Sequence, residues 1–193
     1  MILVPNRLNI ALVGMPGGGK STVGRQLARQ LGVSFIDSDA VIELRLGEPI
    51  RAFFDRAGEA AFRDVEGEVL AEILARDGDF VLATGGGAVL RESNRDLLKT
   101  STTVLYLRSS PEELFRRLRH DTQRPLLQVR DPLQTLRELF AKRDPLYRQC
   151  AHYTLDTGRP SVHGLVNMAL MQLELAGVID PSRVAAKVGA EPQ

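Results

Sequence analysis

A phosphate-binding motif near the amino terminus constrains the fold of this chain more than any other feature of its sequence. Residues 14–21 read Gly-Met-Pro-Gly-Gly-Gly-Lys-Ser, which satisfies the pattern G-x-x-x-x-G-K-[ST]. The motif follows an apolar run, Asn9–Val13, and precedes a segment of helical period, Lys20–Leu31. In such a strand-to-helix turn, backbone N–H groups converge on phosphate oxygens and the positive end of the helix favours the same charge. The sequence therefore predicts an α/β protein that binds a nucleoside triphosphate.

The polar residues of the motif have separate expected tasks. Lys20 is expected to bridge the β- and γ-phosphates, Ser21 to offer its hydroxyl to magnesium, and Thr22 to line the α-phosphate side. The expected nucleotide contacts in and directly after the motif are Gly17, Gly18, Gly19, Lys20, Ser21 and Thr22. Magnesium is the expected cofactor, and ATP is the expected co-substrate.

Five short apolar or β-branched runs alternate with longer segments of helical period. This alternation is typical of βαβ units, in which helices cover a parallel sheet. The predicted strands are Asn9–Val13, Ser34–Asp37, Phe80–Thr84, Thr103–Leu107 and His152–Leu155. The predicted helices include Lys20–Leu31, Glu59–Arg76, Pro111 to about His120, one that starts after Asp131, and Ser161 to about Leu175. We therefore expect a three-layer fold with helices on both faces of the sheet.

Length and composition indicate how the chain is divided. A chain of 193 residues with 44% hydrophobic residues suits one domain with a buried core, which we expect to span residues 1–176. Residues 177–193 are rich in Gly, Pro and Ala and are expected to form a loose tail. The segment 121–131 carries Pro125 between two predicted helices and is long enough for a mobile flap. We therefore expect a lid at about residues 116–131.

Charge and cysteine content exclude several classes of protein. The 25 basic and 24 acidic side chains nearly cancel, so we expect no binding to nucleic acid or to a membrane surface. Cys150 is the single cysteine, which excludes an internal disulfide and the usual zinc and iron-sulfur clusters. The stretch Met1–Val13 has no small-residue cleavage site, and no run reaches the roughly 18 apolar residues of a spanning helix. We therefore expect a cytoplasmic protein.

Asp37 and Asp39 stand two residues apart at the end of the second predicted strand. Alternation along a strand would point both carboxylates toward the crevice above the sheet, where ligands of such folds bind. One carboxylate could hold a magnesium-bound water while the other orients or deprotonates an acceptor hydroxyl. A simpler interpretation is that they cap a helix beginning near Ala40, which is compatible with one of them being catalytic.

Five further motifs follow the phosphate loop in the order found in one enzyme family. They are Asp37-Ser38-Asp39, Phe62-Arg63-Asp64-Val65-Glu66, Thr84-Gly85-Gly86-Gly87-Ala88, Arg124-Pro125-Leu126-Leu127 and Arg143-Asp144-Pro145-Leu146-Tyr147. On these motifs, as far as about Pro160, the chain resembles the shikimate kinases. The resemblance implies a nucleoside monophosphate kinase-like P-loop fold with a parallel sheet in strand order 2-3-1-4-5. It also implies substrate-binding helices at about residues 39–66, a closing lid and a monomer.

The resemblance assigns roles to the residues near the reacting groups. Asp37 takes the magnesium role together with Ser21, and Asp39 takes the substrate role as the catalytic base beside Lys20. Arg124, in the lid, would swing over the transferring phosphoryl group and neutralise its developing charge, while lid closure excludes water.

The resemblance also assigns the substrate and adenine contacts. Arg63 and Arg143 are the expected clamp of the substrate carboxylate, because a guanidinium fork matches a carboxylate in a bidentate way. A plainer interpretation makes Arg63 a helix-surface partner of Glu66. The amides of residues 85–87, namely Gly85, Gly86 and Gly87, are expected to meet the substrate directly. Arg117 and Arg159 are the expected contacts of the adenine base.

The function that the resemblance implies is the transfer of the γ-phosphate of ATP to the 3-hydroxyl of shikimate, in the biosynthesis of aromatic amino acids. The rival enzymes are other small P-loop kinases, such as a gluconate kinase or a nucleoside monophosphate kinase. Asp39 beside the acceptor suits a neutral hydroxyl and would repel a phosphate. A non-catalytic nucleotide-binding regulator is the remaining alternative, and it predicts erosion of catalytic positions that here are all kept.

Overall fold

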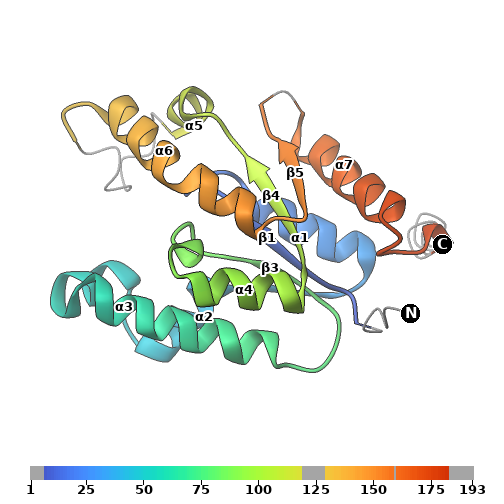
Figure 1. The fold of residues 1–193 in the computed structure, drawn as a ribbon, viewed down its shortest axis with the longest axis horizontal. Coiled ribbons are helices and arrows are strands. Elements are labelled where there is room, and N and C mark those ends of the chain that lie inside the picture. The colour runs from blue at the N-terminus through green and yellow to red at the C-terminus, as the bar shows by residue number, and fades with distance from the viewer. Residues whose placement is uncertain (1–6, 119–128, 159, 183–193) are drawn as a thin grey trace, which may run out of the picture.

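A computed structural model describes residues 7–118, 129–158 and 160–182 of the chain (Figure 1). The strands are β1 Asn9–Val13, β2 Ser34–Asp37, β3 Phe80–Ala83, β4 Thr103–Arg108 and β5 Tyr153–Asp156. The helices are α1 Lys20–Leu31, α2 Ser38–Leu46, α3 Ile50–Leu74, the short 3-10 helix η1 Ala88–Leu90, α4 Glu92–Ser101, α5 Pro111–Leu118, α6 Pro132–Cys150 and α7 Val162–Leu175. Every strand begins and ends within one residue of its predicted position.

Within the described ranges, the five strands form one parallel sheet in the order β2-β3-β1-β4-β5. This is the order that the family resemblance implies. The connection that leaves β1 leads to β2 on one side of it, whereas the connection that leaves β3 leads to β4 on the other side. Such a change in the direction of the connections opens a crevice at the carboxyl ends of the strands. None of the helices in the described ranges has the length and apolarity needed to cross a membrane.

The side chains of β1 alternate between two cores. Ile10 and Leu12 are fully buried against one cluster, which includes Val23 and Leu27 of α1 and Val166 of α7. The next cluster lies on the opposite face, where Ala11 and Val13 meet apolar residues of α3, α4 and α6. Figure 1 shows α3, α4 and α6 on one side of the strands and α1 with α7 on the other. The strands are buried on both faces, which explains why they read as continuous apolar runs.

The substrate-side helix differs most from its sequence prediction. The predicted helix Glu59–Arg76 is the second part of α3, which begins at Ile50 and contains a break at Gly58. Gly58 has φ 83° and ψ 171°, a backbone conformation outside the helical region that glycine adopts without a steric penalty. The apolar periodicity is clear only after this break, so the sequence pattern missed the first turns of the helix.

The packed part of the chain continues past α7. The N–H of Val178 donates a hydrogen bond to Leu173 O at 2.9 Å, and Gly177 takes a left-handed conformation with φ 68°. Ile179 is 5% exposed and belongs to the cluster that includes α1 and α7. The core therefore includes residues that were assigned to the tail, whereas residues 183–193 lie outside the described residues.

The expected lid lies largely outside the described part of the chain. Residues 116–118 end α5, and residues 129–131 lead into α6, whose first turn is capped by the Asp131 carboxylate through the Gln134 N–H at 3.0 Å. The predicted Pro132 at the start of this helix is confirmed. Arg124 and the rest of residues 119–128 are not among the described residues.

The burial of Ile179 gives a test of where the domain ends. We expect Ile179→Ala to lower the free energy of unfolding by about 2 to 5 kcal/mol, because it removes a buried aliphatic side chain and leaves a cavity. The matched control is Leu175→Ala, since Leu175 is 79% exposed, and we expect that change to be within about 0.5 kcal/mol of zero. Urea unfolding of both variants measures the difference, and equal effects would place Ile179 outside the core.

Candidate active site

A hollow of about 360 Å³ opens at the carboxyl ends of β1, β2 and β3. It is lined by Pro16, Gly17, Gly19, Lys20, Ser21, Thr22, Asp37, Asp39, Thr84 and Gly86. Eight of these residues, all except Pro16 and Thr84, were predicted from the sequence to bind nucleotide, metal or substrate. The position of the hollow fits the general rule that ligands of open parallel sheets bind where the strand order reverses.

The phosphate loop takes a shape that glycine permits. Gly17 and Gly19 have φ 78° and φ 85°, in the left-handed region that other residues avoid. Gly18 is packed inside the loop, where its N–H donates to Met15 O at 3.1 Å. α1 begins directly after Gly19 and has no acidic residue in its first turn, so the positive end of its dipole faces the hollow undiminished.

Lys20 lies within this loop and is only 8% exposed. Its ammonium group donates hydrogen bonds to Gly14 O at 2.9 Å and Met15 O at 3.0 Å. These contacts hold the cation at the mouth of the loop, where it also acts on Asp39 electrostatically. An anion in the hollow would therefore meet converging N–H groups, a helix terminus and a fixed positive charge.

Ser21 and Asp37 form a pair that fits a magnesium ion. The Ser21 hydroxyl donates to Asp37 Oδ2 at 2.6 Å. Asp37 also caps α2, because its Oδ1 accepts the Asp39 N–H at 3.1 Å. The capping interpretation is thus correct for Asp37, with α2 starting at Ser38 instead of near Ala40, and the two oxygens allow both roles. A hydroxyl and a carboxylate are hard oxygen ligands, which Mg²⁺ prefers alongside phosphate oxygens.

Asp39 reaches the hollow from the first turn of α2. The argument from strand alternation was wrong, because β2 ends at Asp37 and Asp39 is helical. The pKa of the Asp39 carboxyl is raised to about 6, mainly by burial and also by the negative charge of Asp37, while Lys20 opposes the shift. A carboxylate with a pKa near neutrality is suited to accept a proton during a reaction at physiological pH.

The glycine run that follows β3 is explained by its neighbours. A Cβ atom at Gly85 would lie 2.6 Å from Asp39 Oδ1, and one at Gly86 would lie 2.7 Å from the ring of Pro16. At Gly87 a Cβ atom would collide with the guanidinium group of Arg63. Each glycine thus makes room for a different part of the site, and any larger residue would displace the group beside it.

The polar groups of this run are partly engaged within the protein. The Gly85 N–H donates to Ser38 Oγ at 3.0 Å, and the Tyr147 hydroxyl donates to Gly86 O at 2.6 Å. The Gly85 amide is thus already engaged within the protein, and the expectation that these amides meet the substrate stays a prediction. The amides of Gly86 and Gly87 are left as the candidates for a substrate contact.

Arg63 lies between the glycine run and two acidic side chains. Its guanidinium group donates to Glu66 Oε2 at 2.6 Å and pairs with Glu59 at 3.2 Å. The predicted pairing of Arg63 with Glu66 is therefore confirmed. Glu66 is 3% exposed, and burial raises the pKa of its carboxyl although Arg63 acts in the opposite direction. The buried acid fixes the fork of Arg63 against Gly87.

Arg143 approaches the same cluster from α6. It is partly buried, its positive charge lowers the pKa of the Glu66 carboxyl, and it also interacts with the Tyr147 phenol. The guanidinium groups of Arg63 and Arg143 thus act on one buried carboxylate, that of Glu66. Glu59, the other acidic partner of Arg63, is 62% exposed. The cluster keeps an excess of positive charge beside the glycine run, which suits the carboxylate of an acidic ligand.

Arg117 lies in the last turn of α5. It donates to Thr157 O at 2.5 Å, which holds it against the connection between β5 and α7. A hollow of about 320 Å³ opens there, lined by Arg108, Ser110, Glu113, Asp156, Gly158 and Pro160. Arg117 is thereby placed beside the segment that contains Arg159, but Arg159 itself is outside the described residues.

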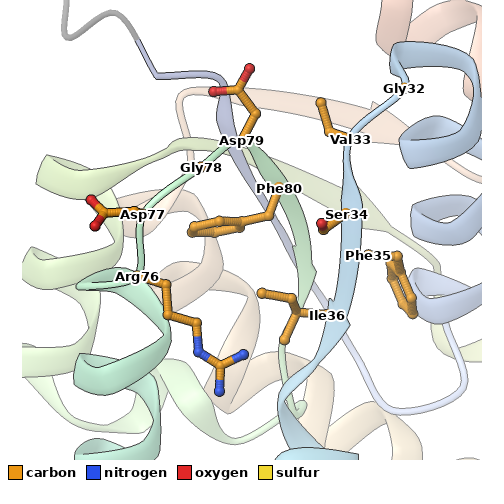
Figure 2. A pocket seen from close by; sticks show the side chains of 10 residues that line it. All are labelled: Gly32, Val33, Ser34, Phe35, Ile36, Arg76, Asp77, Gly78, Asp79 and Phe80. Carbon is orange, nitrogen blue, oxygen red and sulfur yellow. The ribbon is translucent and has the colours of Figure 1, made fainter.

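A larger hollow, of about 720 Å³, lies at the opposite end of the sheet. Figure 2 shows that it is bounded by the chain entering β2, from Gly32, and by the chain entering β3, from Arg76 to Phe80. It is therefore at the amino ends of these strands, away from Lys20 and the glycine run. The smaller hollow, and not this one, contains the residues suited to chemistry.

Four residues of the site were not predicted from the sequence. Ser38 binds the Gly85 amide, Pro16 packs against Gly86, Thr84 lines the hollow, and Tyr147 holds the Gly86 carbonyl. All four stand inside the motifs quoted from the sequence, and Tyr147 also stands four residues after Arg143, a helical spacing, but none was given a role there. The other contacts join segments that are distant in sequence.

The chain matches known proteins over most of its length. A family model described as shikimate kinase matches residues 16–174. Shikimate kinases of Paracidovorax citrulli and Burkholderia lata are 58% and 56% identical to it, over 91% and 89% of this chain and 97% and 92% of theirs. A solved shikimate kinase from Acinetobacter baumannii, in complex with shikimate, is similar with a TM-score of 0.82 and 44% identity, over 91% of this chain and 97% of that one.

A gluconokinase from Sinorhizobium meliloti is similar with a TM-score of 0.58 and 21% identity, over 88% of this chain and 93% of that one. That likeness is one of fold alone. The match of the family model and the high identity to curated relatives go further, and they agree with the arrangement of the phosphate loop, Asp39 and the glycine run. The chain belongs to the shikimate kinase family.

Proposed function

We propose that this protein transfers the γ-phosphoryl group of ATP to the 3-hydroxyl of shikimate, giving shikimate 3-phosphate and ADP. The observation that carries the proposal is the position of Asp39. Its carboxylate lines the hollow of the phosphate loop and touches Gly85, so it stands between a nucleotide site and an acid-binding cluster. A base at this junction is what transfer to a neutral hydroxyl needs.

ATP binds along the phosphate loop, with its phosphates on the loop amides and Lys20. Ser21 and Asp37 are the residues that would hold magnesium, and the ion when bound would neutralise charge on the phosphate oxygens. Asp37 keeps its side chain oriented for this task because the Asp39 N–H binds its other oxygen. Arg117 and Arg159 contact the adenine base in this proposal.

Shikimate binds on the other side of Asp39. Its carboxylate docks on Arg63 and Arg143, where the paired guanidinium groups outnumber the buried Glu66, and on the amides of Gly86 and Gly87. This grip places the hydroxyl that reacts at the Asp39 carboxylate. Binding energy from the acid end of the molecule thus fixes the orientation of the alcohol end.

In the reaction the 3-hydroxyl oxygen attacks the γ-phosphorus in line with the departing ADP oxygen. Asp39 accepts the hydroxyl proton as the new O–P bond forms, and the bond between the γ-phosphorus and the β,γ-bridging oxygen breaks. Lys20 and the lid residue Arg124 stabilise the charge that spreads over the transferring group. Positioning and electrostatics supply the acceleration, and no covalent enzyme intermediate is required.

A parallel assay of acceptors tests the proposed function. With ATP and magnesium we expect turnover with shikimate, and none above the rate of ATP hydrolysis with gluconate or with nucleoside monophosphates. Asp39 beside the acceptor would repel a nucleotide phosphate. Gluconate carries a carboxylate, as shikimate does, so its rejection is expected from the Phe62-Arg63-Asp64-Val65-Glu66 and Gly85-Gly86-Gly87 motifs, which match the shikimate kinases. Coupled detection of ADP ranks the acceptors, and preference for gluconate or a nucleotide would refute the proposal.

The raised pKa of Asp39 predicts the pH dependence of the reaction. Asp39 acts as a base only when it is deprotonated, so kcat/KM for shikimate should fall as the pH falls through the Asp39 pKa of about 6. Above that pH the base is ionised and kcat/KM should reach a plateau. Initial rates measured between about pH 5 and 8, a range that includes the expected transition, give its midpoint.

Asp39→Asn is the control for that titration. It keeps the size of the side chain and removes the base, so we expect kcat to fall by at least about a hundredfold while the Kd of ATP stays nearly unchanged. The residual activity should lose the transition near pH 6. A variant with near-normal turnover, or with the same pH midpoint, would remove Asp39 from the mechanism.

Arg143→Lys tests the carboxylate clamp. We expect KM for shikimate to rise by about tenfold or more, because lysine keeps the charge and loses the bidentate fork, with little change in the Kd of ATP. Arg148→Lys is the matched control, since Arg148 lies on the same helix, is exposed and pairs with Asp144 at 2.7 Å. Equal KM values in the two variants would contradict the clamp.

A further inference from the structure

A single hydrogen bond connects α6 to the glycine run. The hydroxyl of Tyr147 donates to Gly86 O at 2.6 Å, across 61 positions of sequence. Tyr147 is fully buried, and Gly86 lines the hollow that contains Asp39 and Lys20. The bond therefore reaches from the interior of the protein to the wall of the active site.

The Tyr147 hydroxyl stays protonated and can donate its hydrogen bond at any pH near neutrality. Burial raises the pKa of this phenol to about 12, so the proton stays on the oxygen throughout the pH range in which the enzyme is assayed. The ring itself is held by the ring of Tyr106, with centroids 5.0 Å apart. Because the ring cannot swing away, the Gly86 carbonyl is held in one direction.

The direction of this carbonyl determines the direction of a neighbouring amide. Gly86 C=O and Gly87 N–H belong to one planar trans peptide and point to opposite sides of it. Glycines on both sides of that peptide would otherwise permit it to rotate. The Tyr147 bond thus keeps the Gly87 N–H pointing away from α6, at the residue whose missing side chain makes room for Arg63.

The same tyrosine lies beside the second arginine of the clamp. Arg143 is one helical turn before Tyr147 in α6, and its guanidinium group interacts with the Tyr147 phenol. Tyr147 therefore interacts with Arg143 within the same helix, and its hydroxyl also binds the peptide that presents the Gly87 amide. Its hydroxyl fixes the separation of the two groups that are expected to meet the acid.

We propose that Tyr147 is a positioning residue for the acid substrate, which holds the Gly86–Gly87 peptide and Arg143 in register through its hydroxyl. The proposal rests on the proposed function, because Arg143 and the glycine amides bind the acid in that function. It goes beyond it by assigning a role to a side chain that touches neither nucleotide nor reacting atoms. Removing the hydroxyl alone should loosen the grip on the acid and leave the nucleotide site unaffected.

Tyr147→Phe removes that hydroxyl and keeps the ring. We expect KM for shikimate to rise by about tenfold, as for the loss of one buried hydrogen bond that orients a binding group, with the Kd of ATP within about twofold of the wild type. A loss of folded protein would lower kcat through the active fraction and would not move KM. The split between KM and kcat therefore separates a positioning role from a merely structural one.

Tyr106→Phe is the matched control. Tyr106 is the other member of the stacked pair and is equally buried, but its hydroxyl donates to Asp144 Oδ1 at 2.8 Å instead of to the glycine run. It loses a buried hydrogen bond of the same kind, so its stability should fall to a similar extent. We expect its KM for shikimate to stay within about twofold of the wild type.

A second measurement reports on the peptide directly. In isotope-labelled protein without ligands, the Gly87 amide resonance should shift in Tyr147→Phe and stay in place in Tyr106→Phe. An unchanged Gly87 resonance together with an unchanged KM in Tyr147→Phe would overturn the inference. If Arg143→Lys raises KM in the same assays, that result leaves the proposed function intact, whereas a wild-type protein without turnover of shikimate would overturn both.

Discussion

The hydrogen bond from the Gly85 N–H to Ser38 Oγ joins the two chain segments on which the rest of the site depends. β2 and β3 are paired in parallel, with Asp37 opposite Ala83, so the segments that leave these strands emerge side by side. Ser38 belongs to the start of α2 and Gly85 to the run after β3. Because Gly85 has no side chain, Asp39 can occupy the space beside it, where a Cβ atom would lie 2.6 Å from Asp39 Oδ1. The register of the sheet thus brings Asp39, the proposed base, beside the glycine run, the proposed site of the acid.

Electrostatics divide the site into two halves on either side of Asp39. On one side, Lys20 and the start of α1 present positive charge to a polyanion, and Asp37 with Ser21 offers oxygen atoms to a cation. On the other side, Arg63 and Arg143 exceed the charge of the buried Glu66. Burial raises the pKa of Asp39 more than the positive charge of Lys20 lowers it, and this pKa is about 6. A carboxylate in this position stays ionised at neutral pH yet can take up a proton during transfer.

The sequence could predict most of the fold, and part of the site, because the relevant signals are local. Buried parallel strands read as apolar runs, and the phosphate loop is one contiguous motif. The break at Gly58 was missed because a left-handed glycine inside a helix has no periodicity of its own. Asp39 was placed at the hollow by an argument from strand alternation that the start of α2 at Ser38 makes invalid. The partners of Gly85 and Gly86 lie 47 and 61 positions away, and only the folded chain brings them together.

Two side-chain hydrogen bonds attach α6 to β4 and to the run after β3. Asp144 accepts the Tyr106 hydroxyl of β4, and Tyr147 reaches the run after β3, so two consecutive turns of the helix are fixed to two different strands. Arg143 lies one helical turn before Tyr147, whose hydroxyl ties this part of α6 to the glycine run, whereas the bond from Tyr106 to Asp144 does not reach that run. Arg63 is held separately by Glu66 in α3. In the clamp that we propose, Arg63 is held by the buried Glu66 and Arg143 is held near the glycine run through Tyr147, so an acid between them would be selected by rigid geometry as well as by charge.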